Sequence, residues 1–306
     1  MKHAGLLSAT LCTALLTACG SKPVIPPPVV SDSQNFMASG MAAYDDNRYS
    51  EARSFFGRAF MEYRSVDDQE HEADALTDLA DAALQQGDVT AARDEIKQAR
   101  AVLASHPVAG LPAQLTLLEA YTALLDKDPV SAITLLDALR ADAGAAAEVK
   151  RAALFARAQA AFDAKAPDAA QWVTKLGAAT GDLEQARLDR LQALVDPSKA
   201  PALYADALQH YQAAYYRPGI AAVHEEWGAL LMSQQDWKGA RDHLQRGLDI
   251  RLWMNDATRS ARNFDSLQQA DTALGDTATA QQDAKWSDYL KNGGDTAKTP
   301  YSGSNQ

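Results

Sequence analysis

The chain has 306 residues, and its 29 Lys and Arg side chains against 40 Asp and Glu side chains give a formal net charge of −11. An acidic balance of this size opposes binding to a phosphate backbone. It also opposes adsorption to anionic lipid, for which clusters of basic residues are the usual signature. We therefore expect no nucleic-acid partner.

The chain begins with the features of a secretory signal. Lys2 and His3 precede a mostly apolar stretch from Ala4 to Leu16, and small residues follow, which is the order found in such signals. The apolar stretch is too short to span a bilayer stably. We expect residues 1–18 to be a signal peptide that is removed.

The segment Leu16-Thr17-Ala18-Cys19-Gly20 resembles the bacterial lipobox, in which the cysteine becomes the lipidated first residue of the mature chain. The resemblance implies acyl chains such as palmitate on Cys19, and two or more chains anchor a protein stably. It also implies delivery to the outer membrane, because Gly20 and not Asp follows the cysteine. The alternative is an ordinary cleaved signal beside a free cysteine.

The mature part would contain a single cysteine. Removing residues 1–18 takes away Cys12 and Lys2, so the mature chain has 29 − 1 = 28 basic side chains against 40 acidic ones, a net charge of −12. No intramolecular disulfide can form, so stability must come from packing. Residues 19–32 comprise the lipidated Cys19 and a Pro-rich spacer, whose prolines favour an extended, semi-rigid segment.

The body of the chain, residues 33–291, is predicted to be all-α. Alanine and leucine dominate it, Gly and Pro stand mainly at segment ends, and almost no stretch alternates as a strand does. Asn292-Gly293-Gly294 is a plausible stop for the last helix. Residues 292–306 are then expected to be a disordered polar tail.

A spacing of large and small residues recurs along the body. The first copy has Phe36, Gly40, Tyr49, Ala52, Phe56 and Ala59, and the second, 40 residues on, has Leu76, Leu79, Ala80, Ala83, Gly87, Ala92, Ile96 and Ala99. Three further copies have Ala120, Ala132, Leu136 and Leu139; Gly228, Trp237, Ala240 and Leu244; and Leu267, Leu274, Gly275, Asp276 and Ala280. Between residues 145 and 216 the pattern is degenerate.

This spacing resembles the tetratricopeptide repeat, a helix–turn–helix unit that stacks on its neighbours. The resemblance implies a right-handed superhelical solenoid of six or seven helix pairs, which is a binding scaffold. Small residues would allow close approach of paired helices, and large residues would fill the grooves. The residues assigned to this packing are Gly40, Ala52, Phe56, Ala59, Ala80, Ala92, Ala99, Gly228, Ala240 and Ala280.

The resemblance also implies a partner site, because partners of this family bind along the first helices of the pairs. The corresponding residues here are Met37, Met41, Tyr44, Leu84, Leu117, Tyr121, Leu124, Phe155 and Phe162. If exposed, they form a contiguous apolar groove that an amphipathic helix or an extended segment could occupy. The alternative is that they are ordinary core residues.

The second half holds another candidate surface. Its aromatic part comprises Tyr204, Tyr211, Tyr215, Tyr216, Trp227, Trp237 and Trp253, with Arg217 among them. Three of the tyrosines are spaced to share one helix face, which packing between helix pairs would equally require. Nearby lie Arg241, Arg246, Arg251, Arg259 and Arg262, which are either solvated charge or a contact for an acidic partner.

The sequence contains no recognisable catalytic or metal site. No two histidines have the spacing that places two metal ligands on one helix face, and Gly228 stands where a zinc-protease pattern beginning at His224 would need its second histidine. Phosphate-loop and nucleophile-elbow motifs are also missing. We expect no enzyme, no metal, and no cofactor other than the covalent lipid on Cys19.

The leading hypothesis is an outer-membrane-anchored, periplasm-facing scaffold that binds a protein or peptide partner in pilus, secretion or envelope assembly. An alternative is an envelope regulator or accessory subunit that recruits a peptidase or a peptidoglycan enzyme. A third is a wall or glycan-binding enzyme with an unfamiliar site. The fold alone does not discriminate among them, and the sequence does not indicate an oligomeric state.

Overall fold

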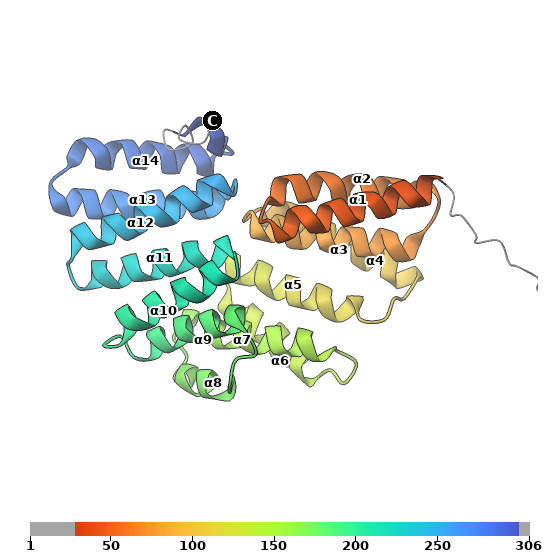
Figure 1. The fold of residues 1–306 in the computed structure, drawn as a ribbon, viewed down its shortest axis with the longest axis horizontal. Coiled ribbons are helices and arrows are strands. Elements are labelled where there is room, and N and C mark those ends of the chain that lie inside the picture. The colour runs from red at the N-terminus through yellow and green to blue at the C-terminus, as the bar shows by residue number, and fades with distance from the viewer. Residues whose placement is uncertain (1–27, 300–306) are drawn as a thin grey trace, which may run out of the picture.

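The computed structural model describes residues 28–299. The expected signal peptide, Cys19 and most of the spacer lie outside this range. Within it the chain forms fourteen α-helices, one 3₁₀-helix and no strand (Figure 1). The predicted all-α array of tetratricopeptide-type helix pairs is confirmed. In the part described, no helix has the length and apolar character needed to cross a membrane.

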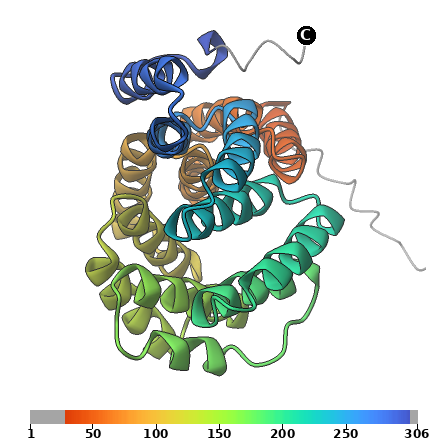
Figure 2. The same ribbon diagram turned by 90° about the vertical axis from the view of Figure 1, so that its left-hand side faces the viewer.

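The helices form seven successive pairs, the upper of the two numbers expected. They are α1 (Pro28–Asp45) with α2 (Tyr49–Ser65), α3 (Gln69–Gln85) with α4 (Val89–Ser105), α5 (Leu111–Leu125) with α6 (Pro129–Ala141), α7 (Ala147–Asp163) with α8 (Ala169–Lys175), α9 (Asp182–Val195) with α10 (Ala200–Ala213), α11 (Arg217–Ser233) with α12 (Trp237–Trp253), and α13 (Ala257–Leu274) with α14 (Thr277–Lys291). Each pair packs on the next in chain order. The result is a right-handed superhelix (Figures 1 and 2).

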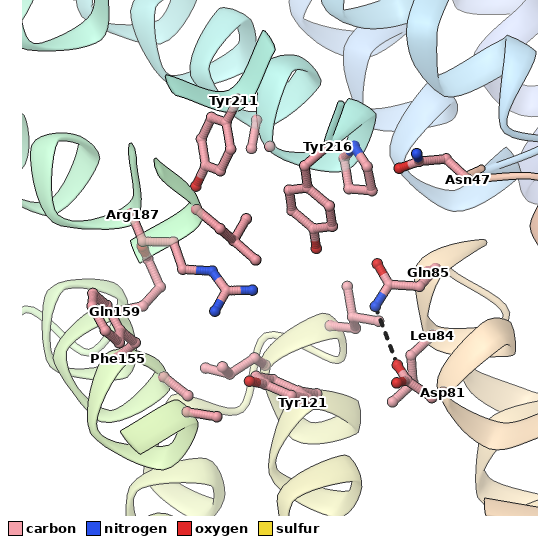
Figure 3. A pocket seen from close by; sticks show the side chains of 18 of the residues that line it. Asn47, Asp81, Leu84, Gln85, Tyr121, Phe155, Gln159, Arg187, Tyr211 and Tyr216 are labelled. Carbon is pink, nitrogen blue, oxygen red and sulfur yellow. Dashed lines mark hydrogen bonds between the residues drawn. The ribbon is translucent and has the colours of Figure 1, made fainter. Parts of the chain in front are cut away.

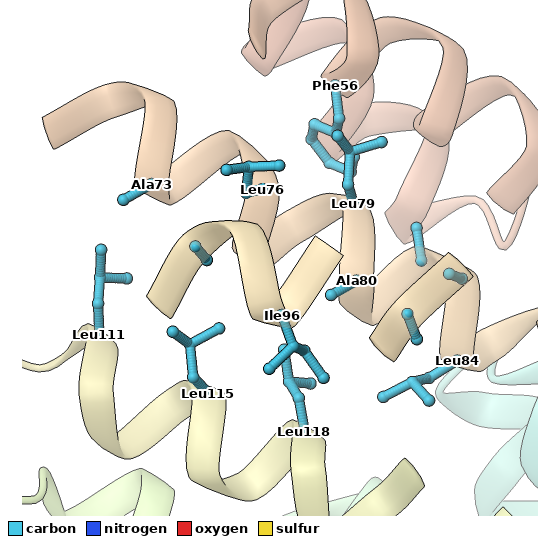
Figure 4. Close-up of a cluster of buried hydrophobic side chains, with 14 of the residues drawn as sticks. Phe56, Ala73, Leu76, Leu79, Ala80, Leu84, Ile96, Leu111, Leu115 and Leu118 are labelled. Atoms are coloured by element: carbon cyan, nitrogen blue, oxygen red, sulfur yellow. The ribbon is translucent and has the colours of Figure 1, made fainter. Parts of the chain in front are cut away.

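Buried small residues allow the paired helices to approach closely. All ten residues assigned to repeat packing are buried. At Gly40 of α1, a Cβ atom would lie 2.4 Å from the ring of Phe56 on α2. Figure 4 shows how Phe56, Leu76 and Leu79 continue this packing into the following pair. The register predicted for these repeats therefore places small residues at the points of close contact.

The degenerate stretch between residues 145 and 216 contains two helix pairs, α7–α8 and α9–α10, and one of their four helices is short. Helix α8 has only seven residues. Trp172 on α8 is buried, and cationic groups surround its ring: the Cζ atoms of Arg157 and Arg140 lie 4.2 and 4.7 Å from the ring centre, and the Nζ of Lys175 lies 3.7 Å from it. Trp172 packs in one buried cluster with residues of α7, α8 and α9 and so ties the short helix to its neighbours.

Both ends of the array differ from the expected boundaries. Helix α1 begins at Pro28, five residues before the predicted start, so the end of the Pro-rich segment is helical and not an extended spacer. After α14, residues 292–299 pack on the array instead of forming a disordered tail. A 3₁₀-helix spans Thr296–Lys298, and the buried Thr296 donates a hydrogen bond from Oγ1 to Oδ1 of Asn255 at 2.9 Å.

The superhelix closes on itself, because turns of the N-terminal pairs contact the C-terminal pairs (Figure 2). We call this contact the seam. Asn47 donates to the carbonyl of Tyr215 at 2.8 Å, and Thr258 donates to the carbonyl of Gly87 at 2.7 Å. The remaining hydrogen bonds of the seam join Arg217 to Asp46 and Asn47, Asn255 to Ser50, Arg259 to Leu84 and Gln85, and Arg262 to Leu125.

The seam is polar. The buried hydrophobic clusters of the described residues follow the chain from pair to pair, and none of them joins α1–α4 to α11–α13. Hydrogen bonds to backbone carbonyls hold the two ends together instead. The seam therefore closes one side of the predicted concave groove, which becomes a central cavity that is still partly open to its surroundings.

Candidate functional site

A cavity of about 940 Å³ lies inside the superhelix. The first helices of six pairs line it: α1, α3, α5, α7, α9 and α11. Arginines from α12 and α13 complete its wall next to the seam. Its volume is at the upper end of the range of small-ligand sites, roughly 300–1,000 Å³. A short chain segment fits such a space, whereas a folded domain does not.

Six of the nine residues predicted for the concave face line this cavity: Tyr44, Leu84, Leu117, Tyr121, Leu124 and Phe155. Leu84 and Phe155 also belong to buried hydrophobic clusters, at 4% and 6% exposure. The other three lie elsewhere. Met37 and Phe162 pack against neighbouring clusters, and Met41 is 45% exposed outside the cavity.

The aromatic segment of the second half is divided between core and cavity. Tyr204 and Tyr211 are buried in one cluster, where Tyr204 packs against Trp227 with ring centres 5.8 Å apart. Tyr211 also borders the cavity, together with Tyr216. Tyr215 does not share the helix face of the other tyrosines. It follows the end of α10 with a φ of 51° and is 79% exposed, because the turn redirects its side chain to the rim.

The arginine cluster of the second half is mostly paired within the protein. Arg251 is buried and donates to both carboxylate oxygens of Glu225, at 2.7 and 3.0 Å. Arg259 pairs with the buried carboxylate of Asp256 at 2.6 Å. Arg241 pairs with Asp271. Because these charges have internal partners, the cluster does not form a free basic surface.

The α3 wall of the cavity carries two carboxylates that the sequence did not single out. Asp81 accepts hydrogen bonds from the Tyr44 hydroxyl at 3.0 Å and from Gln85 at 3.2 Å. Burial raises the pKa of Asp78 to about 7, and the charges of Asp81 and Asp74 add to the effect. Burial also raises the pKa of Asp81. Neither carboxylate forms an ion pair within residues 28–299.

The opposite wall carries arginines on α9. Arg190 pairs with Glu226 on α11, with a closest N–O distance of 2.7 Å. Arg187 forms no ion pair among the described residues, and its Cζ lies 5.9 Å from the ring centre of Tyr216. Figure 3 shows the Arg187 guanidinium projecting into the cavity between Tyr216 and Tyr121, with Asp81 on the far wall. The α9 wall therefore presents a guanidinium without an ion pair in the described chain, and the α3 wall presents two acidic side chains.

Apolar side chains and amides lie between the charged walls. Leu117, Tyr121 and Leu124 come from one face of α5, and Phe155 comes from α7. Three glutamines, Gln85, Gln114 and Gln159, add amide donors and acceptors. A ligand here can be held by apolar contact, by hydrogen bonds and by charge. In the described part of the chain, no group of three or more His, Cys, Asp or Glu side chains is placed to hold a metal ion.

A histidine pair lies between α11 and α12, away from the residues that line the cavity. The Nδ1 atoms of His224 and His243 are 3.0 Å apart, and the His243 ring stacks on Trp227. Burial lowers the pKa of His224 to about 4, helped by the nearby His243 and Arg246. Both rings are consequently neutral near pH 7, and one donates to the other.

No protein-family model and no curated protein matches the chain. Among solved structures it is similar to a Rap protein complexed with Competence and Sporulation Factor, with a TM-score of 0.64 and 13% identity over 86% of this chain and 75% of that one. BtubC from P. vanneervenii (TM-score 0.32, 16% identity, 87% and 92% covered) and the TPR2AB domain of yeast Sti1 (TM-score 0.36, 12% identity, 85% and 99% covered) align far less closely. The likeness to the Rap protein establishes a shared fold.

Proposed function

We propose that this chain is a non-enzymatic scaffold that binds a peptide or an extended segment of a protein partner in its central cavity. The observation that carries the proposal is the lining, in which apolar and aromatic side chains from successive first helices lie between the acidic side chains of α3 and the arginines of α9. An interior of this kind selects a ligand by shape, apolar contact and a few fixed polar groups. The solved Rap protein also has a factor bound.

The proposal includes attachment to the periplasmic face of the outer membrane through acyl chains on Cys19. It rests on the lipobox resemblance of residues 16–20. A Cys19→Ser variant is expected to move from the membrane fraction to the soluble fraction. A variant that stayed in the membrane fraction would require a different means of attachment. Pilus, secretion or envelope assembly is the setting that such a location favours.

Site-specific photo-crosslinking in the intact cell tests the binding role. A photoreactive residue at Gln114, which lines the cavity and whose side chain makes no hydrogen bond to other described residues, should capture the partner. The matched control is the same photoreactive residue at Met61, which is 60% exposed and outside the cavity. Adducts from position 114 that are missing from position 61 would support the proposal.

Two further outcomes decide between the candidate roles. Identical adducts from both positions, or none from position 114, would contradict binding in the cavity. Mass spectrometry of the captured species separates the hypotheses about the partner. A component of an assembly machine favours the scaffold role, whereas a peptidase or a peptidoglycan enzyme favours the regulatory role.

A further inference from the structure

The charges that face the cavity fall into two groups, those with partners and those without. Arg190, Arg251 and Arg259 have carboxylate partners within the protein. Arg187 on α9 and Arg262 on α13 have none among residues 28–299. Arg262 donates to the carbonyl of Leu125 at the seam, whereas the Arg187 guanidinium projects into the cavity (Figure 3). Protein charges in confined sites are ordinarily paired, so a guanidinium that has no carboxylate partner and points into the cavity is a candidate anchor for a ligand.

Arg187 has the chemistry of an anchor for an anion. A guanidinium presents a planar fork of donors that matches a carboxylate in bidentate geometry. The tyrosines at positions 211, 216 and 121 surround it, and Tyr216 lies close enough to contact the group directly. Tyrosine hydroxyls can donate to the same anion. The α9 side of the cavity is therefore suited to a carboxylate.

The α3 side has the complementary chemistry. Asp78 and Asp81 lie one helical turn apart on α3 and both line the cavity. The Tyr44 hydroxyl and the Gln85 amide hold Asp81, which leaves acceptor capacity on its oxygens. No arginine or lysine of the described chain pairs with either carboxylate. An ammonium group would supply the missing charge and the donors.

The space between the two walls suits a peptide main chain. Gln114 offers an amide group toward it, whereas the Gln159 amide is bonded to Asp163 and Arg190. Leu117, Tyr121 and Leu124 provide an apolar floor for side chains. An extended peptide spans about 3.5 Å per residue, so a cavity of about 940 Å³ has room for only a few residues. A ligand with a charge at each end and amides between them matches this order of groups.

We propose that the ligand is a short peptide with both termini free, bound with its C-terminal carboxylate on Arg187 and its α-ammonium group between Asp78 and Asp81. The inference rests on the proposed function and makes it more specific. It fixes the direction of the peptide across the cavity, from α3 to α9. It also means that capping either terminus removes a charge that the cavity is built to match.

The test uses the mature lipid-anchored chain in detergent and a mixed-sequence pool of peptides of roughly three to five residues. The pool is prepared in three forms: with free termini, with an amidated C-terminus, and with an acetylated N-terminus. Equilibrium dialysis with mass spectrometry measures how much of each form is retained. We expect roughly tenfold or greater preference for the free form over either capped form, as hydrogen-bonded charge pairs provide.

Two variants assign the preferences to their walls. Arg187→Gln should remove the discrimination against amidation but keep the discrimination against acetylation, and Asp78→Asn should weaken only the second. Arg246→Gln removes a charge from the exposed face of α12, outside the cavity, and should change neither. Arg187 has no ion pair in the described chain, so its replacement leaves no carboxylate unpaired.

The outcomes separate the inference from the function that it rests on. Equal retention of free and amidated peptides by the wild type would overturn the inference. So would an Arg187→Gln variant that still prefers the free peptides over the amidated ones. If the wild type retained all three forms equally, the inference would be overturned, but the proposal that peptides bind in the cavity would stand. No retention of any form would also overturn it, and the crosslink at position 114 then decides separately whether the cavity binds a partner. The wild-type comparison stands even if a variant fails to fold.

Discussion

At the scale of single residues, close contact between helices depends on glycine, which has no Cβ atom, at the point where the helices meet. Gly40 on α1 faces the Phe56 ring, whereas Gly57 on α2 has no atom within 4 Å of where its Cβ would stand. Gly40→Ala is therefore expected to lower the free energy of unfolding by about 1–3 kcal/mol through overpacking. Gly57→Ala should raise it by up to about 1 kcal/mol through helix propensity. Chemical denaturation measures both, and equal effects would contradict the packing.

The buried charge network next to the seam depends on one guanidinium. Arg251 is 3% exposed and lies between Glu225 and Asp256, with an N–O distance of 3.6 Å to the second. Arg251→Met leaves the Glu225 carboxylate without its cation, whereas Asp256 keeps Arg259, and should cost about 3–5 kcal/mol of unfolding free energy. Lys199→Ala, at an exposed pair, should leave the melting temperature unchanged. A small effect at Arg251 would show that water reaches these carboxylates.

A buried acid pair in the last helix pair makes stability depend on pH. Burial raises the pKa of Asp283 to about 7, and hydrogen bonding to the neighbouring Asp271 adds to the shift. The pKa of an aspartate in the unfolded chain is ~3.9. Between this pH and a pH of about 7, the folded protein therefore keeps a proton on Asp283 that the unfolded chain has lost. The stability that Asp283 contributes is present at low pH and is lost as pH rises toward 7.

Asp283→Asn should therefore remove part of this pH dependence. Its melting temperature relative to the wild type is expected to rise from pH ~5 to pH ~8, because the amide cannot ionise. Differential scanning calorimetry over that range measures the difference. Parallel profiles for the two proteins would mean that Asp283 titrates normally in the folded state.

At the scale of the helices, one turn recurs between them. A residue in the left-handed region precedes an aspartate N-cap whose side chain accepts from a backbone N–H three residues later. The capping residues are Asp68, Asp88, Asp128, Asp236, Asp256 and Asp276. Such a cap satisfies an N–H group that the first helical turn leaves unpaired.

The contribution of one cap can be measured directly. Asp236 accepts from the backbone N–H of Gly239 at 3.0 Å at the start of α12. Asp236→Ala should lower the free energy of unfolding by about 0.5–2 kcal/mol, whereas Asp236→Asn keeps an acceptor and should change it little. Denaturant titration of the three proteins distinguishes the cases. Equal losses in both variants would assign the effect to charge and not to capping.

At the scale of the whole molecule, closure depends on how closely the turns of distant pairs approach. Gly87 and Gly275 both precede a capping aspartate with φ values of 70° and 81°. A Cβ at Gly87 would lie 2.4 Å from Oδ1 of Asp256 across the seam, whereas a Cβ at Gly275 would meet nothing within 4 Å. The two glycines share a backbone conformation but differ in what faces them.

This difference gives a matched test of the seam. Both Gly→Ala variants carry the cost of a left-handed Ala, about 1–2 kcal/mol, but only Gly87→Ala pushes the ends of the superhelix apart. We expect its radius of gyration in small-angle scattering to exceed that of the wild type and of Gly275→Ala. Equal radii for all three would show that the seam tolerates the added atom.

Much of this protein follows from the local pattern of its sequence. Helix ends are set by neighbours a few residues apart, such as Asp88 after Gly87, and the approach of paired helices is set by small residues such as Gly40 opposite Phe56. These contacts join residues close in the chain, so the spacing alone predicts the helix pairs. The same spacing placed Tyr121 and Phe155 on the inner face, where they line the cavity.

Only the tertiary structure decided how the array ends and what its interior carries. The seam joins residues about 170 positions apart, such as Asn47 and Tyr215, through hydrogen bonds to backbone carbonyls that have no sequence signature. Which charged side chains face one another across the cavity, such as Arg187 and Asp78, depends on helices from pairs that are distant in the chain. Curvature accumulated over seven pairs sets this arrangement, and it cannot be read from any one repeat.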